Sequence, residues 1–324
     1  MAATTTAINH VPKSGVRGFV KRISAGEELS YLVCLAAATT VLIIVVALVY
    51  QLWTQSALPI HKFGWSFLKG KSWDPNSGEF GALPFIYGTC VTSAIALLIS
   101  IPVGVGAAIF LAELAPPKVS NAMTFLIELL AAVPSVIYGL LGIFILIPLI
   151  RAYLVPVLKL TAGGLPLFRG AFYGVSILSA GIILSIMVVP FIISVSREVL
   201  LAVPTEQREA ALALGATKWE ATWDIVIPNA RTGIIGSVFL ALARALGETM
   251  AVTMVIGNTP QIMTSLLAPG YSIAAVIANE FTEATGDLYL SSLVYLGLVL
   301  FGLTIVLNAI ARILIIATQR KGSV

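Results

Sequence analysis

The sequence predicts an all-α integral membrane protein with six transmembrane helices. The 324 residues are 58% hydrophobic and only 10% charged, and the mean hydropathy of +1.00 is far above that of a soluble domain with a polar surface. A helix needs about 20 apolar residues to cross a hydrocarbon core of about 30 Å. The alternating apolar and polar pattern of a membrane β-barrel is absent from the sequence. Windows of sufficient length lie at 31–53, 85–112, 122–150, 173–196, 233–257 and 288–318.

Lysine and arginine concentrate on one predicted side of the membrane. They occur in the amino-terminal tail, in the loops 113–121 and 197–232, and at the carboxy end. The opposite side has fewer, and its last loop, 258–287, has none. By the positive-inside rule, both termini are therefore expected in the cytoplasm. The net charge of +4 is expected to record this orientation rather than nucleic-acid binding, and the first span, too long for a signal peptide, is expected to stay as an anchor.

The chain is expected to divide into a polar tail (1–30), a first helix with an outside loop (31–84), a membrane core (85–318) and a short end (319–324). Trp65 and Trp73 of the outside loop are expected at the level of the lipid headgroups. The stretch GWSFLKGKS in this loop resembles a phosphate-binding loop, but its glycines are one residue too far apart and no strand precedes it. Nucleotide binding there is therefore not expected.

Few residues could form disulfides, bind a metal or act as catalytic groups. Cys34 and Cys90 lie in different predicted spans, and His10 and His61 lie in the tail and the outside loop, so neither a disulfide framework nor a metal site is expected. The sequence also has no paired carboxylates and no nucleophile–base arrangement that could support a membrane enzyme. It has no ATPase motif of its own, so a transporter of this sequence would need energy from a partner.

The loop 197–232 contains strong helix signals. Pro204 and Thr205 end the preceding helix and offer an N-cap, and the alanine-rich run that follows predicts a helix over 206–214. Gly215 supplies the left-handed position that ends it. A capping box from Thr217 to Glu220 then predicts a second helix.

This second helix is expected to end at Pro228. The small-residue face around Ala210 favours close docking of another protein. An amphipathic connector resting on lipid would instead place Lys or Arg beside large apolar side chains.

Three stretches carry a resemblance to a known family. Glu209-Ala210-Ala211, followed at fixed spacing by Gly215 and by Ile225 and Ile227-Pro228, matches the EAA loop of bacterial ABC importer permeases. ELLAAVPSVIYGLLG (128–142) and LARALGETMAV (242–252) are similar to the third and fifth spans of PstC-type permease subunits of the high-affinity phosphate importer. The general resemblance covers about 85–318.

The resemblance implies a MetI-like permease core in the bacterial cytoplasmic membrane. It implies a coupling helix seated on an ATPase, with Glu209, Ala210, Ala211 and Gly215 at the contact. It also implies a PstA-type permease, two PstB-type ATPase subunits and an external PstS-type phosphate-binding protein as partners. The chain itself would then hold no cofactor, because ATP and Mg would be bound by the ATPase subunits.

Other functions stay open at this point. Permeases for sulfate or another oxyanion share the EAA loop. An ion-coupled secondary transporter would need carboxylates in several spans, whereas only Glu248 lies deep in a predicted span. A membrane enzyme is the weakest alternative.

Arg244 and Glu248 are the candidate residues of the translocation path. They lie four residues apart in the fifth predicted span, which would place them on one helical face within reach of each other. A lone charge at membrane depth costs about 2.5 to 3.5 kcal/mol on insertion scales, so such residues normally face a bundle interior or a water-filled cavity. Arg244 is expected to bind the anion through its planar fork. The alternative is that the two charges only neutralise each other.

Ser135 and Tyr138 are further path candidates. Pro134 removes one N–H and clashes with the carbonyl of Leu130, so the third span is expected to loosen there. The two hydroxyls that follow are at spacings that could line a cavity and bind phosphate oxygens. The alternative is that Tyr138 packs and that Ser135 bonds its own backbone.

Overall fold

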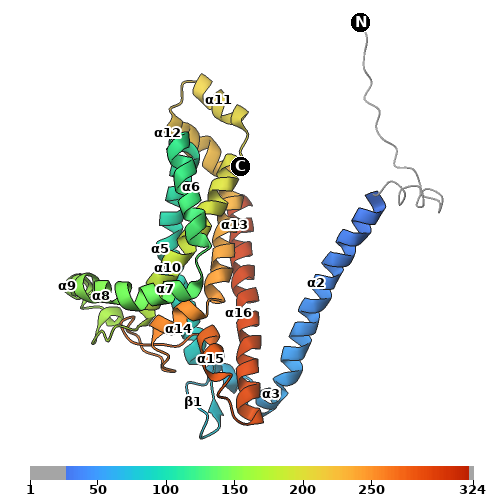
Figure 1. Ribbon diagram of the computed structural model, residues 1–324, viewed down its shortest axis with the longest axis vertical. Helices are drawn as coiled ribbons and strands as arrows, with labels where there is room; N and C mark the ends of the chain where they lie inside the picture. Colours follow the sequence, from blue (N-terminus) through green and yellow to red (C-terminus); the bar gives the residue numbers. More distant parts are fainter. Residues whose placement is uncertain (1–26, 321–324) are drawn as a thin grey trace, which may run out of the picture. The chain divides into compact units, whose positions relative to one another are not determined.

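The computed structural model describes residues 27–320, so most of the predicted tail and the segment 321–324 lie outside the described residues. The chain divides into two units, Met1–Thr54 and Gln55–Val324, so the outside loop belongs to the unit that contains the membrane core. The described part of the first unit is one long apolar helix, α2 (Glu27–Gln55). The second unit contains all other elements described below (Figure 1).

Over residues 55–320, the regular secondary structure of the second unit is helical except for one small hairpin. Its elements are α3 (Ala57–Phe63), α4 (Ser66–Lys69), β1 (Trp73–Asp74), β2 (Glu79–Phe80), α5 (Leu83–Ile109), α6 (Pro117–Ala131), α7 (Ser135–Leu141), α8 (Ile147–Leu149), α9 (Val155–Ala162), the 3₁₀ turn η4 (Pro166–Phe168), α10 (Ile177–Leu201), α11 (Thr205–Ala213), α12 (Lys218–Ala221), α13 (Ile227–Leu246), α14 (Met250–Ile256), α15 (Ile273–Glu280) and α16 (Asp287–Arg320). The two strands pair antiparallel, with Trp73 opposite Phe80.

In the described part of the chain, six helices are long and apolar enough to cross a membrane, which confirms the predicted number. They are Ser30–Gln55, Leu83–Leu114, Ser135–Ala162, Ile177–Leu201, Lys218–Leu246 and Asp287–Ile310. The window 122–150 is broken between Ala131 and Ser135, at the place where the third span was expected to loosen. The expectation of a span over 233–257 is wrong in one respect, because the helix is broken between Leu246 and Met250.

The central helix of the second unit is α10, whose apolar side chains are buried along most of its length. It packs against α5, α7, α13 and α14, and the largest core cluster is built around it. Two glycines permit the close approach of α5 and α10. A methyl group added at Gly104 would lie 2.7 Å from the side chain of Ile192, and one added at Gly181 would lie 2.6 Å from that of Ile95. Small residues serve this purpose because helices in lipid associate through tight packing.

Prolines shape several helices through wide π turns. Within residues 27–320, each π turn ends two residues before a proline. A π turn adds one residue to the helical repeat, so the carbonyl that the proline ring would strike in a regular α-helix is moved aside. The pairs are η1 (Phe110–Leu114) with Pro116, η2 (Gly142–Leu146) with Pro148, η3 (Ile150–Leu154) with Pro156 and η5 (Thr222–Val226) with Pro228.

The hairpin and α15 lie at the end of the second unit opposite α11 and α12 (Figure 1). Trp73 is buried here and donates a hydrogen bond from Nε1 to the Glu280 carboxylate at 2.8 Å, while Tyr289 donates to the same oxygen at 2.7 Å. The indole N–H of Trp73 is therefore bonded to the protein and not to a lipid headgroup, while the level of Trp73 in the membrane stays a prediction. Trp65, by contrast, is 83% exposed.

Candidate functional site

The first candidate region is the loop between α10 and α13. The helix expected over 206–214 is α11 (Thr205–Ala213), and Gly215 has the expected left-handed backbone, with φ of +91°. Thr205, expected as an N-cap, is instead the first helical residue, because Pro204 occupies the cap. The predicted capping box is confirmed: Thr217 N–H donates to the Glu220 carboxylate at 2.7 Å, and Glu220 N–H donates to the Thr217 hydroxyl at 3.2 Å.

The expectation that Pro228 ends the second helix is wrong. α12 continues through the π turn η5 into α13, and together they form one span, Lys218–Leu246. The wide turn makes this possible, since Ile227 N–H bonds five residues back to the Thr222 carbonyl and the proline enters without a clash. α12 and the fifth span are therefore one continuous helix.

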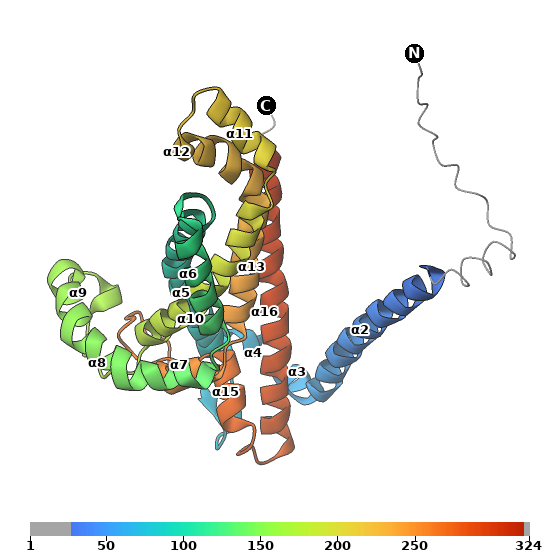
Figure 2. The ribbon, with the colours of Figure 1, turned by 45° about the horizontal axis from the view of Figure 1, so that its top comes forward.

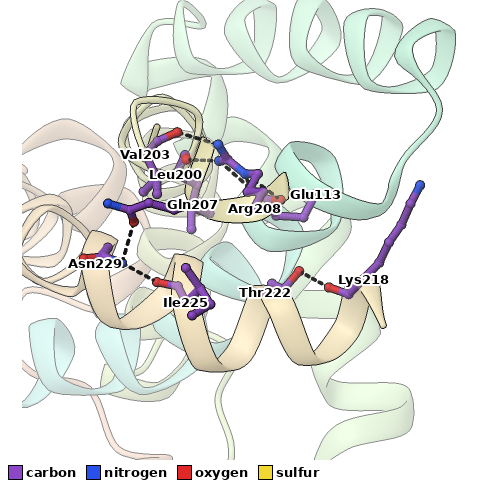
Figure 3. Close-up of polar contacts among 9 residues, drawn as sticks. All are labelled: Glu113, Leu200, Val203, Gln207, Arg208, Lys218, Thr222, Ile225 and Asn229. Atoms are coloured by element: carbon purple, nitrogen blue, oxygen red, sulfur yellow. Dashed lines mark hydrogen bonds and ion pairs between the residues drawn. The ribbon is translucent and has the colours of Figure 1, made fainter. Parts of the chain in front are cut away.

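Arg208 fixes α11 to the spans beneath it (Figure 3). Its Nη2 and Nε donate to the Glu113 carboxylate at 2.8 to 3.3 Å, and Nη2 also donates to the Leu200 carbonyl at 2.7 Å. Nη1 donates to the carbonyl of Val203. The ion pair is shielded from water, with the Arg208 side chain 18% exposed and that of Glu113 10% exposed.

A second contact joins α11 to the start of α13. The Asn229 side-chain amide donates to the Gln207 side-chain oxygen at 2.9 Å and to the Ile225 carbonyl at 2.8 Å (Figure 3). Both side chains are exposed, so water competes for these bonds more than for those of Arg208.

The residues expected at the ATPase contact differ in their exposure to solvent. Glu209, Ala210 and Gly215 are exposed, whereas Ala211 is buried, with 9% of its surface exposed. The Ala211 carbonyl accepts the Ala216 N–H at 3.1 Å, and α11 as a whole contacts the π turn η5. Ala210 and Ala213 thus present the exposed small side chains of α11, and the role of Ala211 at an ATPase contact stays a prediction.

The second candidate region surrounds the break before Pro134. The predicted loosening is confirmed, since α6 ends at Ala131 and Pro134 adopts extended backbone, with ψ of 140°. In both views α6 lies beside α5, whereas α7 turns across the other helices (Figures 1 and 2). The Leu130 carbonyl, which loses its regular helical partner, accepts the Tyr138 hydroxyl at 2.7 Å.

Tyr138 is thus 5% exposed and its hydroxyl donates to the backbone, as in the packing alternative. Ser135 is half-buried at the first position of α7. Their role in a path stays a prediction.

Arg244 and Glu248 lie on either side of the second break. α13 ends at Leu246, so the expected arrangement on one helical face is wrong. The Glu248 carboxylate accepts the Ala251 N–H at 3.2 Å. A negative charge is favourable at this place, because the amino end of α14 carries partial positive charge. Arg244 is exposed in the last turn of α13, its guanidinium carbon 6.0 Å from the centroid of the Phe191 ring. Among the described residues, the two charges form no ion pair with each other.

The two breaks come together because α7 packs on α14. A methyl group at Gly139 would lie 3.3 Å from the Ala251 backbone, so glycine permits the contact. The four path candidates lie beside these interruptions: Ser135 and Tyr138 in α7, Arg244 in the last turn of α13 and Glu248 just before α14. Helix ends at such interruptions are typical ion and anion sites in transporters.

Sequence reasoning missed Glu113, Arg208 and Phe191. Glu113 and Arg208 are distant in sequence; Glu113 directly follows the second predicted span and Arg208 lies in the 197–232 loop, and charges are ordinary at both places. The available signal was their opposite sign on the same predicted side of the membrane. Phe191 carried no signal, because an aromatic residue in an apolar span is common.

Comparisons with known proteins agree with this architecture. The family model "Binding-protein-dependent transport system inner membrane component" matches residues 100–318. A relative from Mesorhizobium japonicum, "Phosphate transport system permease protein PstC", is 46% identical and covers 99% of each chain. Relatives of the same name from Xylella fastidiosa and Haemophilus influenzae are 48% and 45% identical, covering 88% and 87% of this chain and 89% and 91% of their own lengths.

Among solved structures, a chain of the inward-facing MetNI methionine ABC transporter is 18% identical, covers 72% of this chain and 93% of its own length, and has a TM-score of 0.46. The family match extends from α5 to α16 and includes both candidate regions. The chain belongs to the family of inner membrane components of binding-protein-dependent transport systems.

Proposed function

We propose that the chain is a permease subunit of an ATP-driven importer of inorganic phosphate. The observation that carries the proposal is the similarity, over nearly the whole chain, to relatives named as phosphate transport system permeases. The broken spans support it, because they place one accessible guanidinium, that of Arg244, beside interrupted helix ends.

In this proposal Arg244 binds phosphate in transit and Glu248 limits the strength of that binding. The planar fork of Arg244 suits tetrahedral oxyanions. The Glu248 carboxylate repels the anion, so the site holds phosphate weakly enough to release it. Ser135, half-buried at the start of α7, is a candidate donor to phosphate. Tyr138 can join only if its hydroxyl leaves the Leu130 carbonyl.

The remaining subunits are assigned by the same proposal. A PstA-type permease pairs with the chain, PstB-type ATPase subunits hold ATP and Mg and dock on α11 through Glu209, Ala210 and Gly215, and a PstS-type protein delivers phosphate from outside. Both termini then lie in the cytoplasm, on the side of α11. The small, exposed Ala210 and Ala213 side chains support close docking there.

The test is ATP-driven uptake of radioactive phosphate by the chain co-purified with its co-expressed subunits in vesicles. Uptake that depends on both ATP and the external binding protein is expected. Equal competition by sulfate would favour a general oxyanion permease. Uptake that persists without the ATPase would favour an ion-coupled transporter and overturn the proposal.

A further inference from the structure

Arg208 joins three elements that are not adjacent in the sequence. Its own helix is α11, its ion-pair partner Glu113 lies in the π turn that ends the second span, and its two carbonyl partners, Leu200 and Val203, lie at the end of α10. The guanidinium thus fills the point where α11, α5 and α10 meet (Figure 3).

The chemistry of this contact makes it stiff. The last carbonyls of a helix lack intrahelical partners and carry partial negative charge, so a cation at the end of α10 is favourable. The guanidinium is planar, and its fork engages the Glu113 carboxylate through two nitrogens. Because both side chains are largely shielded from water, removal of one partner leaves the other charge uncompensated.

The same helix connects this contact to the second candidate region. α10 carries Leu200 at the Arg208 end and Phe191 beside Arg244. A shift of α10 along or about its axis therefore moves Phe191 relative to the guanidinium of Arg244. α5 follows α10, because the two pack closely at Gly104 and Gly181.

We propose that Arg208 is the positioning residue that transmits movement of α11 to α5 and α10, and through α10 to Arg244. This rests on the proposed docking of an ATPase on α11. The Asn229–Gln207 contact carries the same movement to α13, but more weakly, because it is exposed. Loss of Arg208 then separates ATP hydrolysis from transport while α11 still meets the ATPase.

The experiment compares Arg208→Gln, Arg208→Lys and Glu113→Gln with the control Arg231→Gln. Arg231 lies near the same loop but has no ion pair within the described chain. Each variant is made in two forms, one of which carries Ala210→Cys in a background with Cys34→Ala and Cys90→Ala and is labelled with a photoreactive maleimide. Crosslinking to the ATPase is measured with the labelled form, and ATP hydrolysis and phosphate uptake are measured with the form that keeps Ala210 and carries no label.

In Arg208→Gln, crosslinking and hydrolysis are expected to stay within about twofold of wild type. Phosphate taken up per ATP is expected to fall about tenfold, which is a typical size for the coupling between two sites. Arg208→Lys gives an intermediate ratio, because the charge meets Glu113 but the fork is lost. Glu113→Gln gives a smaller fall, because the carbonyl bonds remain. Arg231→Gln leaves the ratio unchanged.

Two results overturn the inference. One is an unchanged uptake per ATP in both Arg208→Gln and Glu113→Gln. The other is a joint loss of crosslinking and hydrolysis in both, which would mean that the ion pair only builds the loop. If the protein without substitutions at Arg208 or Glu113 shows neither crosslinking nor ATP-driven uptake, the proposed function fails. This result differs from a failure of the inference about Arg208, which appears only when the variants are compared with wild type.

Discussion

Two arginines of this chain have opposite surroundings. Arg208 is shielded and hydrogen-bonded by a carboxylate and two backbone carbonyls, whereas Arg244 is exposed at the end of α13 and has an aromatic ring as its described neighbour. A guanidinium whose donors are occupied can hold elements together, but it has little left for a ligand. One whose donors face open space can bind an anion. The surroundings of Arg208 thus suit a connection between elements, and those of Arg244 suit the anion site proposed above.

The largest expected effect comes from Arg244. Arg244→Gln removes charge-assisted bonds to phosphate worth about 3 kcal/mol in total, so uptake falls about 100-fold. Uptake of radioactive phosphate and co-purification of the ATPase are the measurements, and co-purification is expected to persist. Arg244→Lys recovers little, because the planar fork is lost.

Near-normal uptake by a correctly inserted Arg244→Gln protein would show that Arg244 does not bind phosphate during transport. The cation–π contact with Phe191, worth about 0.5 to 1 kcal/mol at an exposed site, would then be the main role of Arg244.

The next effect separates two neighbouring alanines on α11. Ala210→Arg places a bulky charge on the exposed face and is expected to weaken ATPase docking by about 2 kcal/mol, or about 30-fold, while the chain still inserts. Ala211→Arg forces a charge into the loop interior and is expected to lower the amount of folded protein instead. Crosslinking to the ATPase and quantification of folded protein distinguish the two.

If Ala210→Arg leaves crosslinking from Ala213→Cys intact, α11 does not dock as proposed. The contacts of Arg208 with Glu113 and the end of α10 would then have no movement of α11 to transmit.

A smaller effect tests which groups of the second region are already bonded. Tyr138→Phe removes the hydroxyl that donates to the Leu130 carbonyl, so the free energy of unfolding falls by about 1 kcal/mol and the melting temperature drops. Because that hydroxyl is occupied, uptake is expected to change by less than about threefold. Thermal unfolding in detergent and phosphate uptake are the measurements. A loss of uptake as large as that of Arg244→Gln, with stability unchanged, would place Tyr138 with the ligand rather than with the backbone.

The smallest effect concerns the exposed contact of the first region. Asn229→Ala removes the amide that bonds Gln207 and the Ile225 carbonyl, and the expected loss of stability is about 0.5 kcal/mol, since water replaces exposed bonds. Uptake per ATP is expected to fall less than in Arg208→Gln. The matched control is Gln207→Ala, which removes only one of the two bonds. An effect of Asn229→Ala equal to that of Arg208→Gln would mean that the buried contact has no special role.

The prolines show how far the sequence could be read. Pro134 was expected to interrupt a helix and does so, and the chain is extended there. Pro228 was expected to end a helix and does not, because η5 makes room for its ring. A π turn alone does not decide the outcome, since η1 precedes Pro116 and the helix still ends there, whereas Pro190 lies inside α10. The effect of a proline therefore depends on the packing of each helix against its neighbours.

The sequence by itself determined the membrane class, the number of spans, the helix pair of the 197–232 loop and its capping box. These follow from composition, length and hydrogen bonds between near neighbours, which act without the rest of the fold. Only the tertiary structure decided that the fifth span breaks at Gly247, that Arg208 pairs with Glu113, and that Ala211 faces inward. Arg208 and Glu113 come from distant parts of the chain, and the sequence pattern records the presence of such groups but not their distances.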